Sequence, residues 1–134
     1  MIEDIAIDTN ILVYCHSNDE PDKKEIATRL LDLQPTVSTQ VLSEYLNVVK
    51  RRLKLPKEEI LQVCRQNIEF CRLFAVNNNT LKFAGELISL YDFQMFDSIV
   101  VAAAFEANCK ILYSEDLHHG LLIKKQLRII NPFT

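Results

Sequence analysis

The sequence has only two glycines, Gly85 and Gly120, among its 134 residues. Two glycines cannot form the G-x-G-x-x-G motif of dinucleotide-binding folds, and neither begins a G-x-x-x-x-G-K-[ST] phosphate loop. Both classes of nucleotide-binding protein are therefore excluded. Tight β-turns also favour glycine and proline, and the chain has only four prolines. A fold rich in helices is predicted rather than an all-β fold.

Signals for structural zinc, export and membrane insertion are missing as well. The four cysteines form no C-x-x-C pair and have no zinc-finger spacing to the three histidines. Cys64 and Cys71 lie two helical turns apart, so we interpret them as part of an apolar helix face rather than as a redox pair. No leader-like segment begins the sequence, and no apolar run is long enough to span a bilayer. We expect a cytoplasmic protein with reduced thiols.

Length and composition fit a single globular domain over residues 1–134. Hydrophobic residues make up 49% and charged residues 25% of the chain, and no linker or internal repeat divides it. The net charge of -3 argues against nucleic-acid binding driven by overall positive charge. Binding of phosphate groups would therefore depend on bound cations and on local basic side chains.

Short β-favouring segments alternate with longer segments of helical periodicity along the whole chain. The predicted strands cover residues 5–7, 36–38, 73–76, 110–113 and 127–130. Predicted helices begin after residue 8 and cover about 21–35, 41–54, 56–71, 81–91 and 97–105. Their periodicity predicts inward-facing residues that include Leu61, Ile68 and Leu81. The alternation predicts a three-layer α/β/α fold around a mainly parallel sheet of four or five strands.

Four carboxylates occupy positions at which such a fold could bring them together. Asp8 follows the first predicted strand and Asp116 follows the fourth, and parallel sheets bind ligands beyond the carboxyl ends of their strands. Asp97 begins the alanine-rich helix, while Glu44 borders an apolar helix face, where an unpaired carboxylate is costly. Each acid alone could be a helix cap, a first-turn acid or a turn residue, but the set favours a shared site.

Carboxylates that converge on one site repel one another, and a divalent cation converts this repulsion into coordination. Oxygen ligands favour Mg²⁺ or Mn²⁺. Two such ions about 3.5–4 Å apart can activate water and stabilise the leaving oxygen during attack on a phosphodiester. The acidic set therefore predicts metal-dependent hydrolysis of nucleic acid.

Four segments, in this order, resemble the PIN domain family, and the likeness covers nearly the whole chain. They are Asp8-Thr9-Asn10 after a strand, Ser38 through Glu44, Phe96-Asp97-Ser98-Ile99 opening a small-residue helix, and Ser114-Glu115-Asp116-Leu117 after a strand. In size the chain looks most like the VapC-type toxins of toxin–antitoxin pairs.

The resemblance implies roles for particular residues. Asp8, Glu44 and Asp97 match the acidic triad that holds Mg²⁺ or Mn²⁺, and Asp116 matches a fourth, more variable acidic position, for which Glu115 is the alternative. The small polar positions that line or order the site correspond to Thr9, Asn10 and Ser114.

The same resemblance implies an endoribonuclease that cuts RNA, is inhibited by a small antitoxin protein and forms a homodimer. Two other functions stay open. A PIN-like scaffold could bind RNA or protein without cutting, and Asp8 could be the nucleophile of an aspartate-dependent phosphatase. Such phosphatases have a D-x-D motif, however, and here Asn10 replaces the second aspartate.

The densest basic cluster follows Glu44 on the same predicted helix and extends to Lys57. Lys50, Arg51 and Arg52 are candidates for contact with the RNA backbone. A solvated helix end is the alternative, because helix C-termini favour cations.

Overall fold

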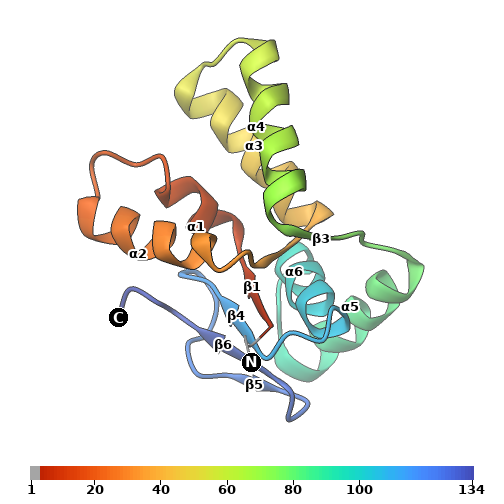
Figure 1. The fold of residues 1–134 in the computed structure, drawn as a ribbon. Coiled ribbons are helices and arrows are strands. Elements are labelled where there is room, and N and C mark those ends of the chain that lie inside the picture. The colour runs from red at the N-terminus through yellow and green to blue at the C-terminus, as the bar shows by residue number, and fades with distance from the viewer. Residues whose placement is uncertain (1–3) are drawn as a thin grey trace.

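The computed structural model describes residues 4–134, which form six helices and six strands (Figure 1). The strands are β1 (Ile5–Ile7), β2 (Thr36–Ser38), β3 (Arg72–Phe74), β4 (Ile111–Tyr113), β5 (Leu122–Ile123) and β6 (Leu127–Ile130). The helices are α1 (Thr9–Tyr14), α2 (Pro21–Asp32), α3 (Thr39–Leu53), α4 (Lys57–Phe70), α5 (Asn78–Tyr91) and α6 (Met95–Glu106).

All six strands form one sheet in the order β3-β2-β1-β4-β6-β5. Neighbouring strands are parallel except for β5, which runs antiparallel to β6. The predicted three-layer α/β/α fold with a mainly parallel sheet is confirmed. The sheet has one strand more than the upper predicted number, because β5 has only two residues and gives no readable alternation in the sequence.

Strand β1 lies inside the sheet and pairs with β2 on one side and with β4 on the other. All three of its residues are buried. The pair Ile7 and Tyr113 brings the carboxyl ends of β1 and β4 side by side. Segments separated by about a hundred residues of sequence therefore meet at this edge of the sheet.

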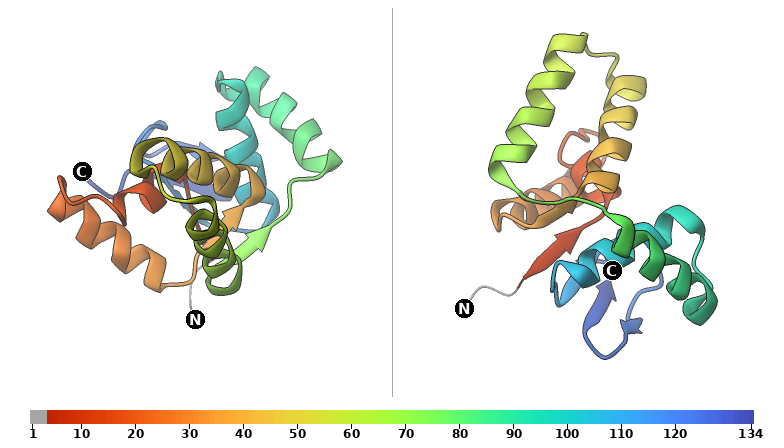
Figure 2. Two further views of the ribbon diagram at one scale, coloured as in Figure 1. Left: turned by 90° about the horizontal axis from the view of Figure 1, so that it is seen from above. Right: turned by 90° about the vertical axis from the view of Figure 1, so that its right-hand side faces the viewer.

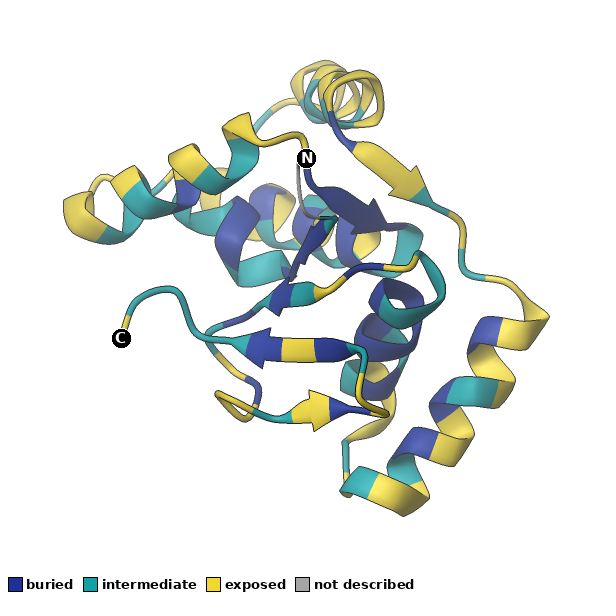
Figure 3. Cartoon of the chain, turned by 60° about the horizontal axis from the view of Figure 1, so that its bottom comes forward, coloured by how far each residue is buried: buried dark blue, intermediate teal, exposed yellow. Residues whose placement is uncertain are grey.

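Helix α6 packs between the sheet and α5, and Figure 3 shows its ribbon, mostly coloured as buried, beside the strands. Six of its residues are buried, among them Val101, Ala102 and Ala103. The small alanine side chains allow the helix to approach its neighbours closely from several sides.

Among residues 4–134 no single helix is long and apolar enough to cross a membrane. Helices α5 and α6 reach that length and hydrophobicity only when they are taken together, and they are bent by 114° relative to each other.

Helices α3 and α4 form a hairpin that projects from the body of the molecule (Figures 1 and 2). The outer helix α4 has no buried residue. Leu61 and Ile68 are 60% and 46% exposed, and Leu81 on α5 is 49% exposed. The prediction that these three residues face inward is wrong, because periodicity reveals an apolar face but not whether another element covers it.

The four cysteines are all free thiols within the described part of the chain. Cys71 and Cys109 are buried, whereas Cys15 and Cys64 are partly exposed. Cys64 and Cys71 thus form no disulfide.

Candidate active site

Asp8 lies where β1 ends and α1 begins, and it is only 7% exposed. Its backbone N–H donates to the carbonyl oxygen of Tyr113, which fixes the turn against β4. Its carboxylate caps α1, since one oxygen accepts from the Thr9 N–H at 2.7 Å, and the other accepts from Ser114 Oγ at 2.8 Å. Burial raises the pKa of Asp8 to about 6, opposed by these two hydrogen bonds and reinforced by repulsion from Glu44 and Asp97.

Glu44 reaches the site from α3. Its Oε2 atom accepts from Thr9 Oγ1 at 2.9 Å, and its Oε1 atom accepts from Gln40 Nε2 at the same distance. Gln40 precedes Glu44 by one helical turn, so this second bond lies along the helix surface. Thr9 therefore ties α1 to α3 and holds the Glu44 carboxylate towards Asp8.

The segment after β4 carries the third group of polar side chains. Ser114 is fully buried, and its hydroxyl oxygen also accepts from the N–H of Asp116 at 3.3 Å. Asn10 donates from Nδ2 to Asp116 Oδ2 at 3.0 Å, and its Oδ1 accepts from the N–H of Glu115 at 3.3 Å. Asn10 and Ser114 thus fix both the backbone of this turn and the side chain of Asp116.

Asp97 lies in the first turn of α6, and with the three other predicted acids it lines one cavity of about 350 Å³. Burial, followed by repulsion from Glu44 and Asp116, raises the pKa of Asp97. The cavity therefore brings together four acids from four separate parts of the chain. The cavity is also lined by Thr9, Asn10, Val13, Tyr14, Val48, Arg52 and Glu115.

The chemistry of these groups fits a hard divalent cation, since they are oxygen donors with an excess of negative charge. As placed, however, no three acidic, histidine or cysteine side chains within residues 4–134 are close enough together to hold one ion. The carboxylates share a cavity, but those of Asp8, Glu44 and Asp116 each accept hydrogen bonds from neighbouring protein groups. A cation would favour their closer approach by removing the repulsion between them.

Glu115 differs from Asp116 in its surroundings. Its carboxylate accepts from Tyr14 OH at 2.6 Å and from Lys23 Nζ at 2.7 Å. Burial alone would raise the pKa of Glu115, but the hydrogen bonds from Lys23 and Tyr14 outweigh it and lower that pKa. The hydrogen bond to Glu115 raises the pKa of Lys23, and it also raises that of Tyr14.

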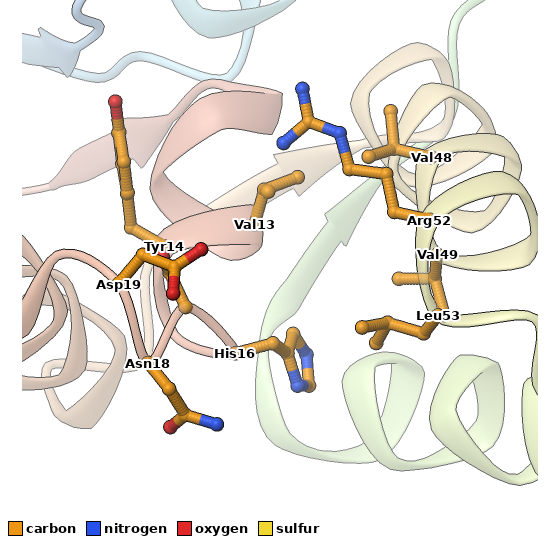
Figure 4. Close-up of a pocket in the computed structure, with 10 residues that line it drawn as sticks. Val13, Tyr14, His16, Asn18, Asp19, Val48, Val49, Arg52 and Leu53 are labelled. Carbon is orange, nitrogen blue, oxygen red and sulfur yellow. The ribbon is translucent and has the colours of Figure 1, made fainter.

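A second cavity of about 340 Å³ continues the acidic cavity between α1 and α3 (Figure 4). The two cavities share Arg52, which extends from α3 towards the side of α1 that bears Val13 and Tyr14. Lys50 and Arg51 are exposed and line neither cavity. Of the three predicted backbone contacts, only Arg52 lies at the site.

A third cavity, also about 340 Å³, adjoins the acidic one on the side of α6 and shares Asp97 and Asp116 with it. Phe93 and His118 are among its lining residues. The acidic cavity is therefore adjoined by another cavity on two sides.

Sequence reasoning did not identify Gln40 and Lys23 as site residues. Gln40 could have been found, because it precedes Glu44 by one helical turn. Lys23 gave no signal of its own, since its partner Glu115 is 92 residues away in the sequence.

The fold and this site define an α/β protein with a carboxylate-lined cavity at the carboxyl ends of parallel strands. The family model of the PIN domain matches residues 5–120, so the chain belongs to the PIN domain family. Comparison with curated proteins gives no significant match.

Several solved structures are similar to this chain in fold, among them the three that follow. A toxin–antitoxin complex from Klebsiella pneumoniae is 17% identical with a TM-score of 0.71, covering 97% of this chain and 98% of that chain. The DNA-bound VapBC complex of Salmonella typhimurium is 16% identical with a TM-score of 0.68, covering 95% and 96%. VapC20 of Mycobacterium tuberculosis, a toxin that cleaves the sarcin-ricin loop, is 17% identical with a TM-score of 0.64, covering 81% and 86%.

Proposed function

We propose that this protein is a Mg²⁺- or Mn²⁺-dependent endoribonuclease that hydrolyses phosphodiester bonds of RNA. The observation that carries the proposal is the shared cavity of Asp8, Glu44, Asp97 and Asp116 in a member of the PIN domain family. The four carboxylates would hold the metal, which when bound supplies activation of water and stabilisation of the leaving oxygen.

Other side chains of the cavity have supporting roles in this proposal. Thr9, Asn10 and Ser114 orient the acids through the hydrogen bonds already described. Arg52 would bind a phosphate of the RNA backbone, because its guanidinium group lines the same cavity and suits phosphate geometry. Lys50 and Arg51 would contact backbone only beyond the site.

We also propose that the protein is a cytoplasmic toxin of a type II toxin–antitoxin pair, with a small antitoxin as its partner and a homodimer as its active form. The similarity to toxin–antitoxin complexes supports this proposal. Exposed apolar side chains on the projecting hairpin, such as Leu53 and Leu61, support a protein partner of some kind. Copurification of a small neighbouring gene product that silences RNA cleavage would test the antitoxin proposal.

The decisive experiment for the enzyme is Asp97→Asn, assayed on a single-stranded RNA oligonucleotide with Mn²⁺. Loss of one metal ligand should lower cleavage by at least about 100-fold while the far-UV circular dichroism spectrum stays unchanged. Asp32→Asn is the matched control, because Asp32 is exposed at the end of α2 and lines none of the three cavities. Undiminished cleavage by Asp97→Asn would exclude the proposed mechanism.

One observation favours a second candidate, a PIN-like scaffold that binds RNA or protein without cutting. Among residues 4–134 the acids are placed too far apart for three of them to hold one ion. Titration calorimetry separates the two proposals, since Mn²⁺ should bind the nuclease and should release no heat with a scaffold.

A further inference from the structure

Glu115 and Asp116 are adjacent carboxylates that line the same cavity, but only one of them has both oxygens engaged. Tyr14 OH donates to Glu115 Oε1 and Lys23 Nζ donates to Glu115 Oε2. Within residues 4–134, Asp116 accepts one side-chain hydrogen bond, at Oδ2 from Asn10, so among these residues its other oxygen is available to a ligand. The two acids therefore differ in what they can offer to a cation.

Lys23 is held in place by more than its ion pair. Its ammonium group lies 5.0 Å from the ring centre of Tyr14 and 5.5 Å from that of Phe133, and it also donates to Tyr14 OH at 3.3 Å. Tyr14 and Phe133 pack edge to face, with their ring centres 5.1 Å apart. The side chains of Lys23 and Glu115 are only 31% and 25% exposed, so this pair is better defined than most surface ion pairs.

The turn that carries Asp116 does not depend on this ion pair for its shape. Ser114 and Asn10 bind its backbone N–H groups, and Asn10 binds the Asp116 side chain. Removal of Lys23 would therefore free Oε2 of Glu115, with Tyr14 still donating to Oε1, and would leave Asp116 tied to Asn10.

We propose that Lys23 is a positioning residue that keeps the Glu115 carboxylate out of the metal-ligand set, so that Asp116 is the fourth acid. This inference rests on the metal-dependent activity proposed above. Without Lys23, the freed Oε2 of Glu115, which already lines the cavity, could act as a further ligand to the cation. More carboxylate ligands bind a divalent cation more tightly, while a ligand in the position of water or substrate slows the reaction. Loss of Lys23 should therefore tighten metal binding and reduce turnover together.

The test compares Lys23→Met, Lys23→Arg and the double variant Lys23→Met with Glu115→Gln. Mn²⁺ affinity is measured by titration calorimetry, and kcat is measured on a single-stranded RNA oligonucleotide. Lys23→Met should bind Mn²⁺ several-fold more tightly and should lose about tenfold in kcat, as outer-shell changes at metal sites do. Lys23→Arg keeps the positive charge and should stay within about threefold of the wild type. The double variant should recover to a similar level, because the competing carboxylate is absent.

Two outcomes overturn the inference. The first is a Lys23→Met variant that keeps the wild-type Mn²⁺ affinity and kcat. The second is a Lys23→Met variant that binds Mn²⁺ more weakly and is not restored by Glu115→Gln, since that result reports structural damage. The proposed function fails separately, if the wild type shows no metal-stimulated cleavage. Calorimetry on the same variants still decides the role of Lys23 in that event.

Discussion

Helices α4 and α6 have 14 and 12 residues, and both carry large apolar side chains, but they are packed in opposite ways. Helix α6 has six buried residues and lies against the sheet and α5, whereas α4 has none and stands on the projecting hairpin. Hydrophobic composition therefore does not decide what a helix contributes to stability. Coverage by other elements decides it, because only area removed from water is stabilising.

The candidate site lies where the body of the molecule meets the projecting hairpin of α3 and α4. The body supplies Asp8, Asp97 and Asp116, and the inner helix of the hairpin supplies Glu44 and Arg52. The body, together with the buried face of α3, should therefore dominate the free energy of unfolding, and the outer helix α4 should contribute little to it.

The largest expected difference between the body and helix α4 is the loss of unfolding free energy when a leucine side chain is truncated. Leu112→Ala removes a fully buried side chain from the strand between β1 and β6, and should cost about 3 kcal/mol of unfolding free energy. Leu61→Ala on α4, where the side chain is 60% exposed, should change it by less than about 0.5 kcal/mol. Urea denaturation followed by circular dichroism measures both. Equal losses would show that α4 is packed as tightly as the body.

The second prediction concerns the buried carboxylate of Asp8. The pKa of Asp8 is about 6 in the folded chain, against an ordinary value of 3.8, so between these pH values the folded state binds more protons than the unfolded state. Stability should therefore fall as pH rises through this range.

Asp8→Asn removes this titration and should be more stable than the wild type by about 1–2 kcal/mol at pH 7.5 in a chelator. The advantage should shrink towards pH 4, where the wild-type carboxyl group is protonated. Urea denaturation at a series of pH values measures the effect. A stability difference that does not change with pH would contradict the assignment of the buried charge to Asp8.

The smallest predicted effect separates two neighbouring arginines of the hairpin. Arg52→Ala should raise KM for a short RNA about tenfold at low salt, which is about 1.4 kcal/mol, and should flatten the salt dependence of binding. Arg51→Ala should change KM by less than about twofold, because Arg51 lines neither of the cavities that Arg52 lines. Equal effects of the two changes would assign RNA binding to the whole basic helix end rather than to Arg52.

The sequence was sufficient to predict most of the fold because its signals are local. Buried strands such as Ile5–Ile7 are short apolar runs, and proline at the start of α2 marks a helix boundary. The four acids were identifiable for the same reason, since each has a recognisable position relative to its own strand or helix.

The features that could not be predicted from the sequence depend on contacts between distant segments. Leu61 and Leu112 are the same kind of residue, and only the tertiary arrangement exposes one and buries the other. Arg51 and Arg52 are adjacent in a basic run, and the direction of α3 decides which of them lines the cavity. The partnership of Lys23 with Glu115 also arises only when α2 packs beside the turn after β4.

The position of β1 inside the sheet has a consequence for the order in which the site can form during synthesis. β1, β2 and β3 are all made within the first 74 residues, but the other neighbour of β1 is β4, which begins at Ile111. Until β4 has emerged, β1 is an open edge, and Asp8 has neither Ser114 nor Tyr113 to bind. The last acid, Asp116, follows directly. A growing chain therefore carries no assembled acidic site until residue 116 is made, and any protein partner that recognises that site meets a nearly complete domain.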